Sequence, residues 1–422
     1  MYDNEDFVRS IATQELARGW HDDPETLKVI KQCATTDKGS FSRSAAIKEL
    51  ASGWHNDPDT LKIIKCAIKE NDSSLRSTAI KELANGWHND SDTLKIIKCA
   101  MKDKDKLFRV TTLQELARGW HNDPETLDII KNLVINNEES SLREKAVHEI
   151  AYGWHEDSEI LSIVESWTMN NNGDVRKAAV YELARNWRDY PKTLHIIKEC
   201  IINDRYSDVR FVAIQELSFG WHNYPETLKI IKDRAINDEN YVVRMSAIEE
   251  LARGWHDDPE TLNVLKDCAV NDKTNFVRYA AIKELILGWG NNPEAFNFIK
   301  DRVINDENSF VRRITLNKVV FGCYKHSETI NLVKKHVNAD KSPEVRMSAI
   351  EELARGWHDD PETINIIKDR AMNDEDNDVR QSAVQELKKW WSEEAEENIE
   401  ENVLSETITD PSISENVKHR KR

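Results

Sequence analysis

The sequence predicts an all-α solenoid, in which antiparallel helix pairs stack into one elongated array. The first observation is a near-perfect internal copy: Val243–Leu262 returns three repeats later as Val345–Ile364, and the only difference is Ile364 in place of Leu262. The second observation is that the same sequence unit can be aligned twelve times along the 422 residues. A unit of this length that forms two helices cannot bury its apolar face alone, so such units stack on their neighbours.

Two columns of residues set the register of these repeats. Trp follows the Arg of each repeat eleven positions later, except in the tenth repeat, where Cys323 stands. Asp stands six positions before the Arg in nine repeats, and Glu70, Asn137 and Asn170 replace it in the others. Because these charges recur in every layer, we expect a structural ladder of Asp–Arg hydrogen bonds rather than one charged site. The Arg column, which numbers the repeats from 1 to 12, consists of Arg9, Arg43, Arg76, Arg109, Arg143, Arg176, Arg210, Arg244, Arg278, Arg312, Arg346 and Arg380.

The Arg column advances with a 33- or 34-residue period. The shorter step separates Arg43 from Arg76, Arg76 from Arg109, and Arg143 from Arg176. The other steps are longer by one residue.

The helix that contains this Arg is called helix B, and its first copy is expected over residues 5–18. In the best copy Val243, Ala247, Ile248 and Leu251 form one apolar stripe with the 3.6-residue period of an α-helix. No segment alternates between apolar and polar residues as a half-buried strand does. The chain is therefore predicted to be helical throughout.

A Gly and an Asp-Pro pair mark the boundaries between the two helices of a repeat. Gly19 and its nine equivalents are predicted to end helix B in a conformation with positive φ. Asp23 and Pro24 then start the second helix, called helix A, as N-cap and first helical residue. Helix A is expected to bury residues such as Leu262, Leu265 and Ala269.

Composition narrows the classes of function. The net charge of −17 argues against a nucleic-acid partner, whose phosphates need a basic surface. No apolar run approaches the roughly 20 residues that a membrane-spanning helix needs, so no membrane span is expected. No pair of Cys forms a CxxC motif, and equivalent positions of stacked helices lie about 10 Å apart, too far for disulfides. We therefore expect buried thiols in a reducing cytoplasm, at the equivalent positions Cys33, Cys66, Cys99, Cys200 and Cys268.

The two ends of the chain differ from the middle. Residues 1–391 are expected to form the solenoid, and the first repeat lacks a helix A in front of its helix B. That arrangement leaves two alternatives: a preceding region covers the first helix, or its apolar edge awaits a partner. Residues 392–422 are acidic and then basic at the end, which predicts a disordered tail.

The paired helices, with Asp at the end of the first and Val-Arg opening the second, resemble the HEAT repeat over residues 1–391. The segment E-L-A-R-G-W-H-D-D-P-E-T-L resembles more closely the HEAT arrays found C-terminal to bacterial NACHT-type signalling NTPases, which look like sensor or scaffold regions. The NTPase itself is absent, since no G-x-x-x-x-G-K-[ST] motif occurs. The resemblance implies a right-handed α-solenoid whose B helices line the concave face.

The Trp and His columns favour structural roles over chemistry. The Trp rings are predicted to form a packing spine between repeats, and an aromatic cage for a cation is the alternative. The His that follows Trp in eight repeats is expected to cap a turn or face solvent, because equivalent His residues about 10 Å apart cannot share one metal ion. No nucleophile or acid–base motif departs from the repeat, so no catalytic residue, metal or cofactor is predicted.

One stripe of helix B varies along the chain. Positions one, five and nine after the Arg are polar in repeats 1–3 but carry aromatic residues, Leu and Met from repeat 6 onward. Exposed side chains of this kind suit the anchors of a protein partner, while packing between repeats is the alternative reading. The predicted partner-binding residues are Tyr181, Phe211, Phe219, Met245, Tyr279, Leu287, Phe321 and Met347, with Arg253 and Arg355 as polar contacts at the rim.

The sequence thus predicts a non-enzymatic, cytoplasmic scaffold or sensor module that binds a protein or peptide in the groove of the B helices. Nucleic acid, membrane and cofactors are not expected as partners, and the oligomeric state stays open. A HEAT-like pigment lyase or chaperone is one alternative, which requires a bound chromophore. A DNA-processing HEAT-like protein is the other, which requires a basic groove.

Overall fold

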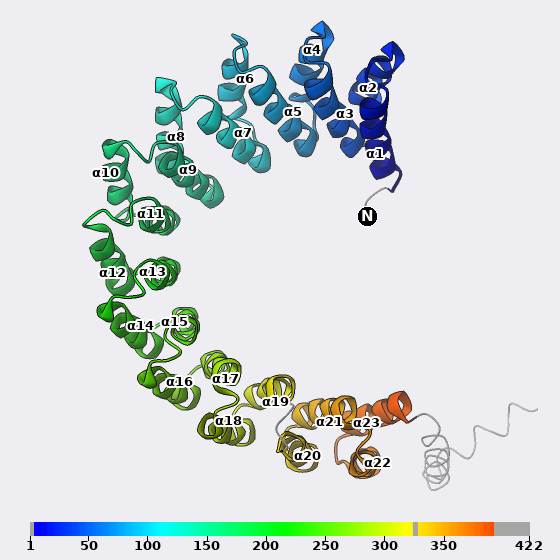
Figure 1. Ribbon diagram of the computed structural model, residues 1–422, viewed down its shortest axis with the longest axis vertical. Coiled ribbons are helices and arrows are strands. Elements are labelled where there is room, and N and C mark those ends of the chain that lie inside the picture. Colours follow the sequence, from blue (N-terminus) through cyan, green and yellow to red (C-terminus); the bar gives the residue numbers. More distant parts are fainter. Residues whose placement is uncertain (1–3, 324–327, 392–422) are drawn as a thin grey trace, which may run out of the picture. The chain divides into compact units, whose positions relative to one another are not determined.

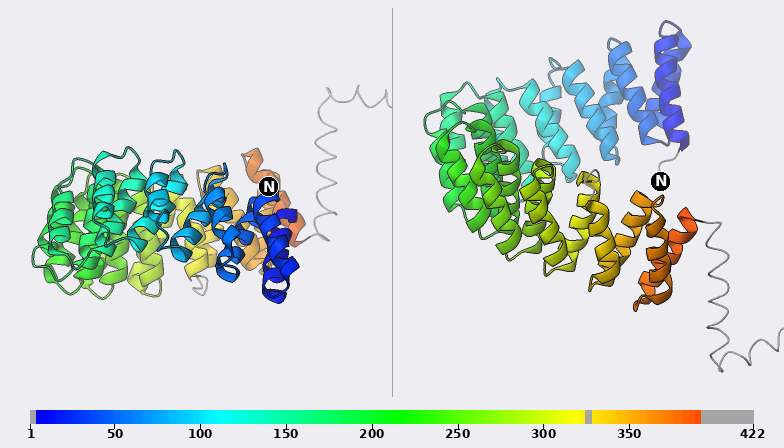
Figure 2. Two further views of the ribbon diagram at one scale, coloured as in Figure 1. Left: turned by 90° about the horizontal axis from the view of Figure 1, so that it is seen from above. Right: turned by 60° about the horizontal axis from the view of Figure 1, so that its bottom comes forward.

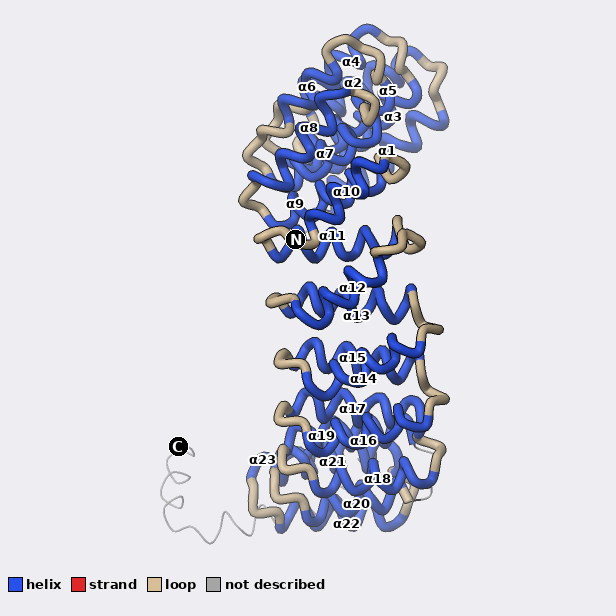
Figure 3. The backbone as a smooth tube through the Cα atoms, turned by 90° about the vertical axis from the view of Figure 1, so that its left-hand side faces the viewer, coloured by secondary structure: helices blue, strands red, loops and turns tan. Residues whose placement is uncertain are grey.

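The computed structural model describes residues 4–323 and 328–391, with the side chains of residues 322 and 323 left out. Within these residues the secondary structure consists of 23 α-helices without any strand (Figures 1 and 3). The predicted all-α solenoid of paired helices is therefore confirmed. Contacts divide the chain into two compact units, unit 1 over residues 1–220 and unit 2 over residues 221–422. The predicted tail, residues 392–422, lies outside the described residues.

Unit 1 begins with a B helix, so its odd-numbered helices are B helices and its even-numbered helices are A helices. Its B helices are α1 (Asn4–Gly19), α3 (Ser40–Gly53), α5 (Ser73–Gly86), α7 (Lys106–Gly119), α9 (Ser140–Gly153), α11 (Gly173–Asn186) and α13 (Ser207–Gly220). Its A helices are α2 (Pro24–Thr36), α4 (Pro58–Ala67), α6 (Thr93–Ala100), α8 (Pro124–Asn136), α10 (Ser158–Trp167) and α12 (Thr193–Asn203).

Unit 2 continues the alternation. Its A helices are α14 (Pro225–Asn237), α16 (Pro259–Asn271), α18 (Pro293–Asn305), α20 (Thr329–Ala339) and α22 (Pro361–Asn373). Its B helices are α15 (Tyr241–Gly254), α17 (Asn275–Trp289), α19 (Ser309–Cys323), α21 (Pro343–Trp357) and α23 (Asn377–Trp390).

The A helices start where the sequence predicts. The Asp23 carboxylate accepts a hydrogen bond of 2.9 Å from the backbone N–H of Glu25, and Pro24 is the first helical residue. This capping satisfies a backbone donor that the first turn of a helix leaves free. The lengths of the A helices also follow the sequence: α4 and α10 have 10 residues and α6 has 8, whereas α2 and α8 have 13. The three shortest A helices lie in the repeats with the shorter step of the Arg column.

The predicted end of helix B is wrong in one respect. No glycine among the described residues has a positive φ. In α15 the chain leaves the helix instead at the residue after Gly254, where Trp255 adopts φ −128° and ψ 41°. The Gly is therefore not required by backbone conformation, and its role lies in the contact described below for Gly288.

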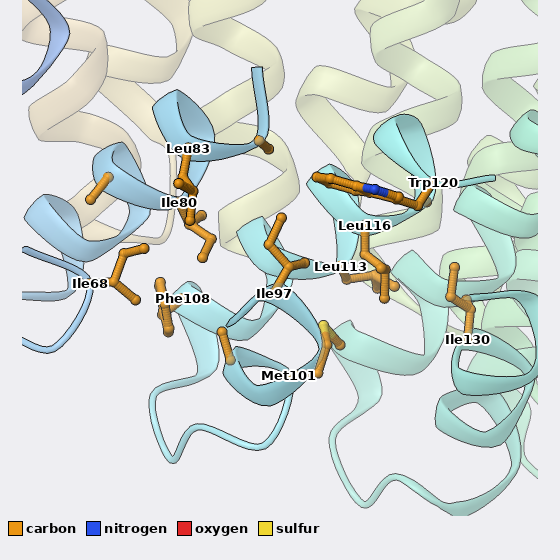
Figure 4. Packing of buried hydrophobic residues seen from close by; sticks show 14 of the residues in the cluster. Ile68, Ile80, Leu83, Ile97, Met101, Phe108, Leu113, Leu116, Trp120 and Ile130 are labelled. Carbon is orange, nitrogen blue, oxygen red and sulfur yellow. The ribbon is translucent and has the colours of Figure 1, made fainter. Parts of the chain in front are cut away.

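Within each unit the helices form two layers, and the core lies between them (Figures 1 and 2). B helices of consecutive repeats pack closely on one another, while neighbouring A helices touch far less. Such unequal packing turns the layer of B helices toward the inner side of the curve of a unit. Figure 4 shows part of the core of unit 1, where Ile80 of α5, Ile97 of α6 and Leu113 of α7 meet. The predicted stripe of helix B is likewise confirmed, since Val243 and Leu251 are fully buried.

The prediction of buried thiols is only half right. Cys200 and Cys268 are buried, and burial raises the pKa of each thiol to about 12. Cys66 and Cys99 are exposed instead. They lie near the C-terminal ends of the short helices α4 and α6. The cysteines that the structure describes are free thiols.

Across the described ranges, none of the helices combines the length and the apolar character that crossing a membrane would require.

Candidate partner-binding surface

The Arg–Asp ladder joins consecutive repeats and is a structural feature. In unit 2, Arg244 binds both carboxylate oxygens of Asp272, at 2.6 and 2.9 Å, and also donates to the backbone carbonyl of Asp238 at 2.7 Å. Asp272 thus belongs to the next repeat, whereas the Asp238 carbonyl belongs to the repeat of Arg244 itself. Each Arg of the ladder therefore connects two consecutive repeats, and such a connection is called a joint below. The same arrangement recurs at Arg278, Arg312 and Arg346. The predicted ladder is confirmed.

The carboxylate of Asp340, one member of the ladder, is held ionised. Burial alone would raise the pKa of Asp340, but hydrogen bonds from His336, Arg312 and the Ser342 backbone N–H outweigh it and leave that pKa well below its ordinary value. Both members of the Arg312–Asp340 pair are almost completely buried. A charged pair in this position is unavailable to a ligand, because its lone pairs and protons are already used inside the protein.

A second joint consists of a His ring on a Trp ring. His256 stacks on Trp289 of the next repeat, with ring centroids 4.2 Å apart and planes 13° from parallel. Its Nε2 lies 2.9 Å from the backbone carbonyl of Gly288, and its Nδ1 lies 3.1 Å from the carboxylate of Asp257. The hydrogen bond to the Gly288 carbonyl, followed by that to Asp257, raises the pKa of His256. The other parallel stacks pair His21 with Trp54, His55 with Trp87, His88 with Trp120, His222 with Trp255, and His358 with Trp390.

This joint bears on part of the Gly column. A Cβ atom on Gly288 would lie 3.2 Å from the His256 ring, which would have to shift slightly, whereas a Cβ on Gly119 would lie 3.6 Å from the His88 ring in ordinary contact. At Gly153, by contrast, a Cβ would meet nothing within 4 Å, because the preceding His121 meets Trp154 edge-on at 6.5 Å. The His column therefore caps the B helix of the following repeat. The Trp column does pack between repeats, but Trp20 remains 60% exposed. Across the described chain, no group of His, Cys, Asp or Glu could hold a metal ion.

In unit 1 two of the predicted binding residues, Tyr181 and Phe219, lie in a small cluster with two guanidinium groups. Arg185 lies over the ring of Tyr181, 4.3 Å from its centroid, and 5.8 Å from the centroid of Phe219. Arg188 lies 5.2 Å from the same Phe219 centroid. Arg185 is held by Glu216 at 3.1 Å. Phe219 is 60% exposed, whereas Phe211 is half-buried.

In unit 2 the predicted residues fall into two groups. Leu287 and Phe321, in the last turns of their B helices, are 65% and 82% exposed. Arg253 and Arg355 hold the same position in their helices and are exposed, while each binds a Glu of its own helix. The first-turn residues Met245, Tyr279 and Met347 are half-buried. Packing between repeats thus explains the partial burial of the first-turn residues, whereas it does not explain the exposed last-turn residues.

An aromatic row that was not predicted from the sequence lies beside this surface. Tyr241, Phe276 and Phe310 stand at the starts of α15, α17 and α19, with ring centroids 6.1 and 5.6 Å apart from one to the next. Tyr279 meets Phe310 edge-on at 6.3 Å, so the row continues into the predicted surface. A usable signal was present, since Phe stands two positions before the Arg in both repeat 9 and repeat 10.

A cleft of about 830 Å³ between α10 and α12 was also missed. Glu165, Met169, Lys192 and His195 are among the residues that line it. Glu165 is held by Lys192 at 3.2 Å, so the charges of the wall are paired with one another. The shortened helix α10 leaves this space, which the shorter step from Arg143 to Arg176 could have signalled.

Comparison with known families identifies the repeats of unit 2. The family of HEAT repeats matches residues 228–317 and 320–388. These segments are HEAT repeats. The same Asp, Arg and Trp columns run through unit 1, and paired helices continue through each unit. The further resemblance to arrays beside NACHT-type NTPases stays a prediction.

Two of the solved structures that align with most of this chain belong to larger proteins. Yeast importin-beta (Kap95p) is 14% identical, with a TM-score of 0.49 over 93% of this chain and 60% of that one. The crystal structure of Kap121p is 11% identical, with a TM-score of 0.43 over 91% of this chain and 53% of that one. The chain thus spans between half and two thirds of the length of these two proteins. No curated protein matches the sequence.

Proposed function

We propose that this chain is a non-enzymatic scaffold or sensor module that binds a protein or peptide partner through the exposed side of its B helices. The proposal rests on the last turns of the B helices. At the same position of three repeats, Phe219, Leu287 and Phe321 expose 60%, 65% and 82% of their surface. Isolated exposed apolar residues need no explanation, but their return at one helical position does.

The residues at this position in other repeats also support a partner-binding surface. In repeats 6, 8 and 11 this position carries Arg185, Arg253 and Arg355 instead. Aromatic residues and Arg are the types most enriched where proteins bind one another, since a ring fills a pocket and a guanidinium forms several hydrogen bonds. Because each Arg is held by a Glu, its position is fixed before a partner arrives, which reduces the entropy lost on binding.

The test is affinity capture from native lysate with Phe219→Ser/Phe321→Ser as the variant and quantitative mass spectrometry as the readout. Both rings are exposed, so the variant is expected to keep the helical content and melting temperature of the wild type. A matched control is Ile135→Ser/Val270→Ser, because these exposed side chains lie in the A helices α8 and α16.

A partner that the wild type and the control capture, and the ring variant loses, supports the proposal. If the ring variant folds normally and captures the same proteins, the B-helix surface is not the binding site. If it melts well below the control, the rings contribute to packing instead, and the alternative reading of the stripe is correct.

A further inference from the structure

Glu115 of α7 is a buried carboxylate without a partner in the described part of the chain. The residue is only 7% exposed, and its side chain forms no hydrogen bond or ion pair with a described residue. A buried carboxylate of this kind costs free energy, because water solvates its charge less well. Glu115 lines a pocket of about 540 Å³ between α5 and α7, so a ligand in this pocket lies beside the carboxylate.

Later repeats of unit 1 show which group a carboxylate at this position binds. Glu115 stands six positions after the Arg of its repeat, where Glu182 and Glu216 are buried as well. Arg185 of the sixth repeat donates from Nε and Nη2 to Glu216 of the seventh, at 3.2 and 3.1 Å. Glu182 of the sixth repeat lies 2.7 Å from Nδ1 of His148 in the fifth. The position therefore receives a basic group from the preceding repeat.

At Glu115 the guanidinium from the preceding repeat is missing. Asn85 of the third repeat holds the position of Arg185, and its side chain is neutral and shorter. Asn85 lines the pocket together with His88, whose Nε2 is already engaged by the Gly119 carbonyl at 2.6 Å. The pocket thus lies where a guanidinium from the chain itself would stand.

Two exposed cations of the pocket are also without a partner. Lys81 and Arg118 line it and form no ion pair with a described residue. Both lie near enough to Glu115 to oppose the rise in pKa that burial causes at this carboxyl. The equivalent carboxylate of the next repeat, Glu149, is already held by Lys145 at 2.8 Å. The pocket therefore combines one buried negative group with two exposed positive groups.

We propose that this pocket binds a ligand with a guanidinium group at one end and a carboxylate at the other, as in free arginine or the C-terminal arginine of a peptide. The guanidinium binds Glu115 as Arg185 binds Glu216, which gives the buried charge a partner. Arg118 and Lys81 bind the carboxylate of the ligand. The proposal does not depend on the partner-binding surface proposed above, and the two are tested with different variants.

The probe is L-arginine, which is titrated into the full chain by isothermal titration calorimetry. We expect saturable binding to one class of site. L-citrulline has a similar shape but a neutral group in place of the guanidinium, and it should bind at least about ten-fold more weakly, because it offers no charged hydrogen bond to a buried carboxylate. Agmatine lacks the carboxylate and should bind several-fold more weakly than arginine.

The two sources of the ligand are distinguished with acetyl-Gly-Gly-Arg that carries a free carboxyl group. If this peptide binds more tightly than L-arginine, the ligand is the end of a peptide. If it binds more weakly, the ligand is the free amino acid, whose ammonium group then also contributes.

Two variants locate the site. Glu115→Gln removes the buried charge and should weaken arginine binding at least about ten-fold, which corresponds to about 1.4 kcal/mol. Asn85→Arg supplies the guanidinium from the chain itself, so it should abolish binding and raise the melting temperature. Tyr152→Arg is the matched control, because it adds an Arg at the same position of the fifth repeat, where the following Glu182 is already held by His148. It should leave binding unchanged.

Three results would overturn the proposal. The first is no saturable binding of arginine or of the peptide, or equal binding of arginine and citrulline. The second is unchanged binding to Glu115→Gln when this variant keeps the helical content of the wild type. The third is an equal loss of binding in Asn85→Arg and Tyr152→Arg, since the added positive charge would then explain the loss without any occupation of the pocket.

Discussion

The Arg–Asp ladder has two forms, one regular in unit 2 and one irregular in unit 1. In unit 2 four consecutive Arg residues bind their Asp through two nitrogens, as Arg312 does with Asp340 at 2.9 and 2.8 Å. Among the first six Arg of unit 1, the first and the sixth do so, as Arg176 does with Asp204 at 2.7 and 2.8 Å. The four Arg between them reach their carboxylates through one nitrogen each. Three of them, Arg76, Arg109 and Arg143, leave a buried Nε without a hydrogen-bond partner among the described residues.

The difference follows from spacing and residue type. Two-nitrogen binding occurs where the Arg column advances by its longer step and the partner is Asp. The shorter step places the carboxylate one residue nearer in the sequence, as in Arg76 and Asp103, and only one hydrogen bond of 2.6 Å remains. Where Asn137 replaces the Asp, Arg109 turns to Glu139 two positions later. A guanidinium and a carboxylate form two parallel hydrogen bonds only in a narrow geometry. A change of one residue in their sequence separation therefore removes one of the two hydrogen bonds.

The largest expected difference between the two units comes from removing one ladder carboxylate in each. Asp340→Asn leaves Arg312 charged and almost wholly buried, and we expect a loss of about 3 kcal/mol, typical of a broken buried ion pair. Asp103→Asn should cost about 1 kcal/mol, because Asp103 is a quarter exposed and makes one hydrogen bond to Arg76. Native-state hydrogen exchange of α19–α21 and α5–α7 measures the two losses separately. Equal losses would show that the two-nitrogen geometry adds nothing.

The pH dependence should differ in sign between Asp340 in unit 2 and Glu115 in unit 1. The pKa of Asp340 is depressed in the folded protein, so its contribution is present above the ordinary value of 3.8 and is lost as the pH falls through the folded pKa. Burial instead raises the pKa of Glu115 in α7, although Arg118 and Lys81 oppose it. Its contribution is present below the ordinary value of 4.5 and is lost as the pH rises through the folded pKa.

The measurement is urea unfolding of two variants between pH 3 and pH 7. The cost of Asp340→Asn should shrink below about pH 4, because protonation of the wild-type carboxylate then favours the unfolded chain. Glu115→Gln should stabilise unit 1 at pH 7 by less than about 1 kcal/mol, and this gain should vanish toward about pH 4. A cost of Asp340→Asn that stays constant down to pH 3 would contradict the assigned direction.

The regularity of the sequence explains how much of this fold could be predicted. The stripe of Val243, Ala247 and Leu251 and the Asp23-Pro24 start depend on neighbouring residues alone, so they could be read directly and are confirmed. The role of Gly53 could not, because it depends on the ring of His21 in the preceding repeat. The local sequence allowed the simpler explanation of a positive φ, which is wrong.

The candidate surface was predictable to a similar extent. Phe219, Leu287 and Phe321 are exposed, as their departure from the repeat suggested, but Phe211 and Tyr279 at the first turn are half-buried. Periodicity places both positions on one face of helix B and says nothing of how closely the next helix approaches each end. The binding role of all these residues stays a prediction.

The irregular ladder can also be repaired, with a smaller effect than breaking the regular one. In Asn137→Asp/Glu139→Gln the carboxylate returns to the same separation from Arg109 that Asp272 has from Arg244. Asn137 already accepts the backbone N–H of residue 139 at 2.9 Å, as the ladder Asp residues do, so Asp fits without rearrangement. We expect a gain of about 1 kcal/mol in urea unfolding, since a buried Nε obtains a partner. Glu139→Gln alone is the control and should destabilise.

The smallest effect should come from the Gly column, where two glycines at equivalent helix ends differ only in the ring beside them. Gly153→Ala meets nothing within 4 Å and should stabilise the protein by about 0.5 kcal/mol, because Ala loses less backbone freedom on folding. Gly53→Ala places its Cβ 3.1 Å from the His21 ring, so the gain should be cancelled as the ring is displaced from Trp54. Thermal unfolding compares the two variants, and His21→Ala in the Gly53→Ala background should restore the gain from Ala. If Gly53→Ala stabilises the protein as much as Gly153→Ala while His21 is present, then the His ring does not select Gly at this position, and the column needs another explanation.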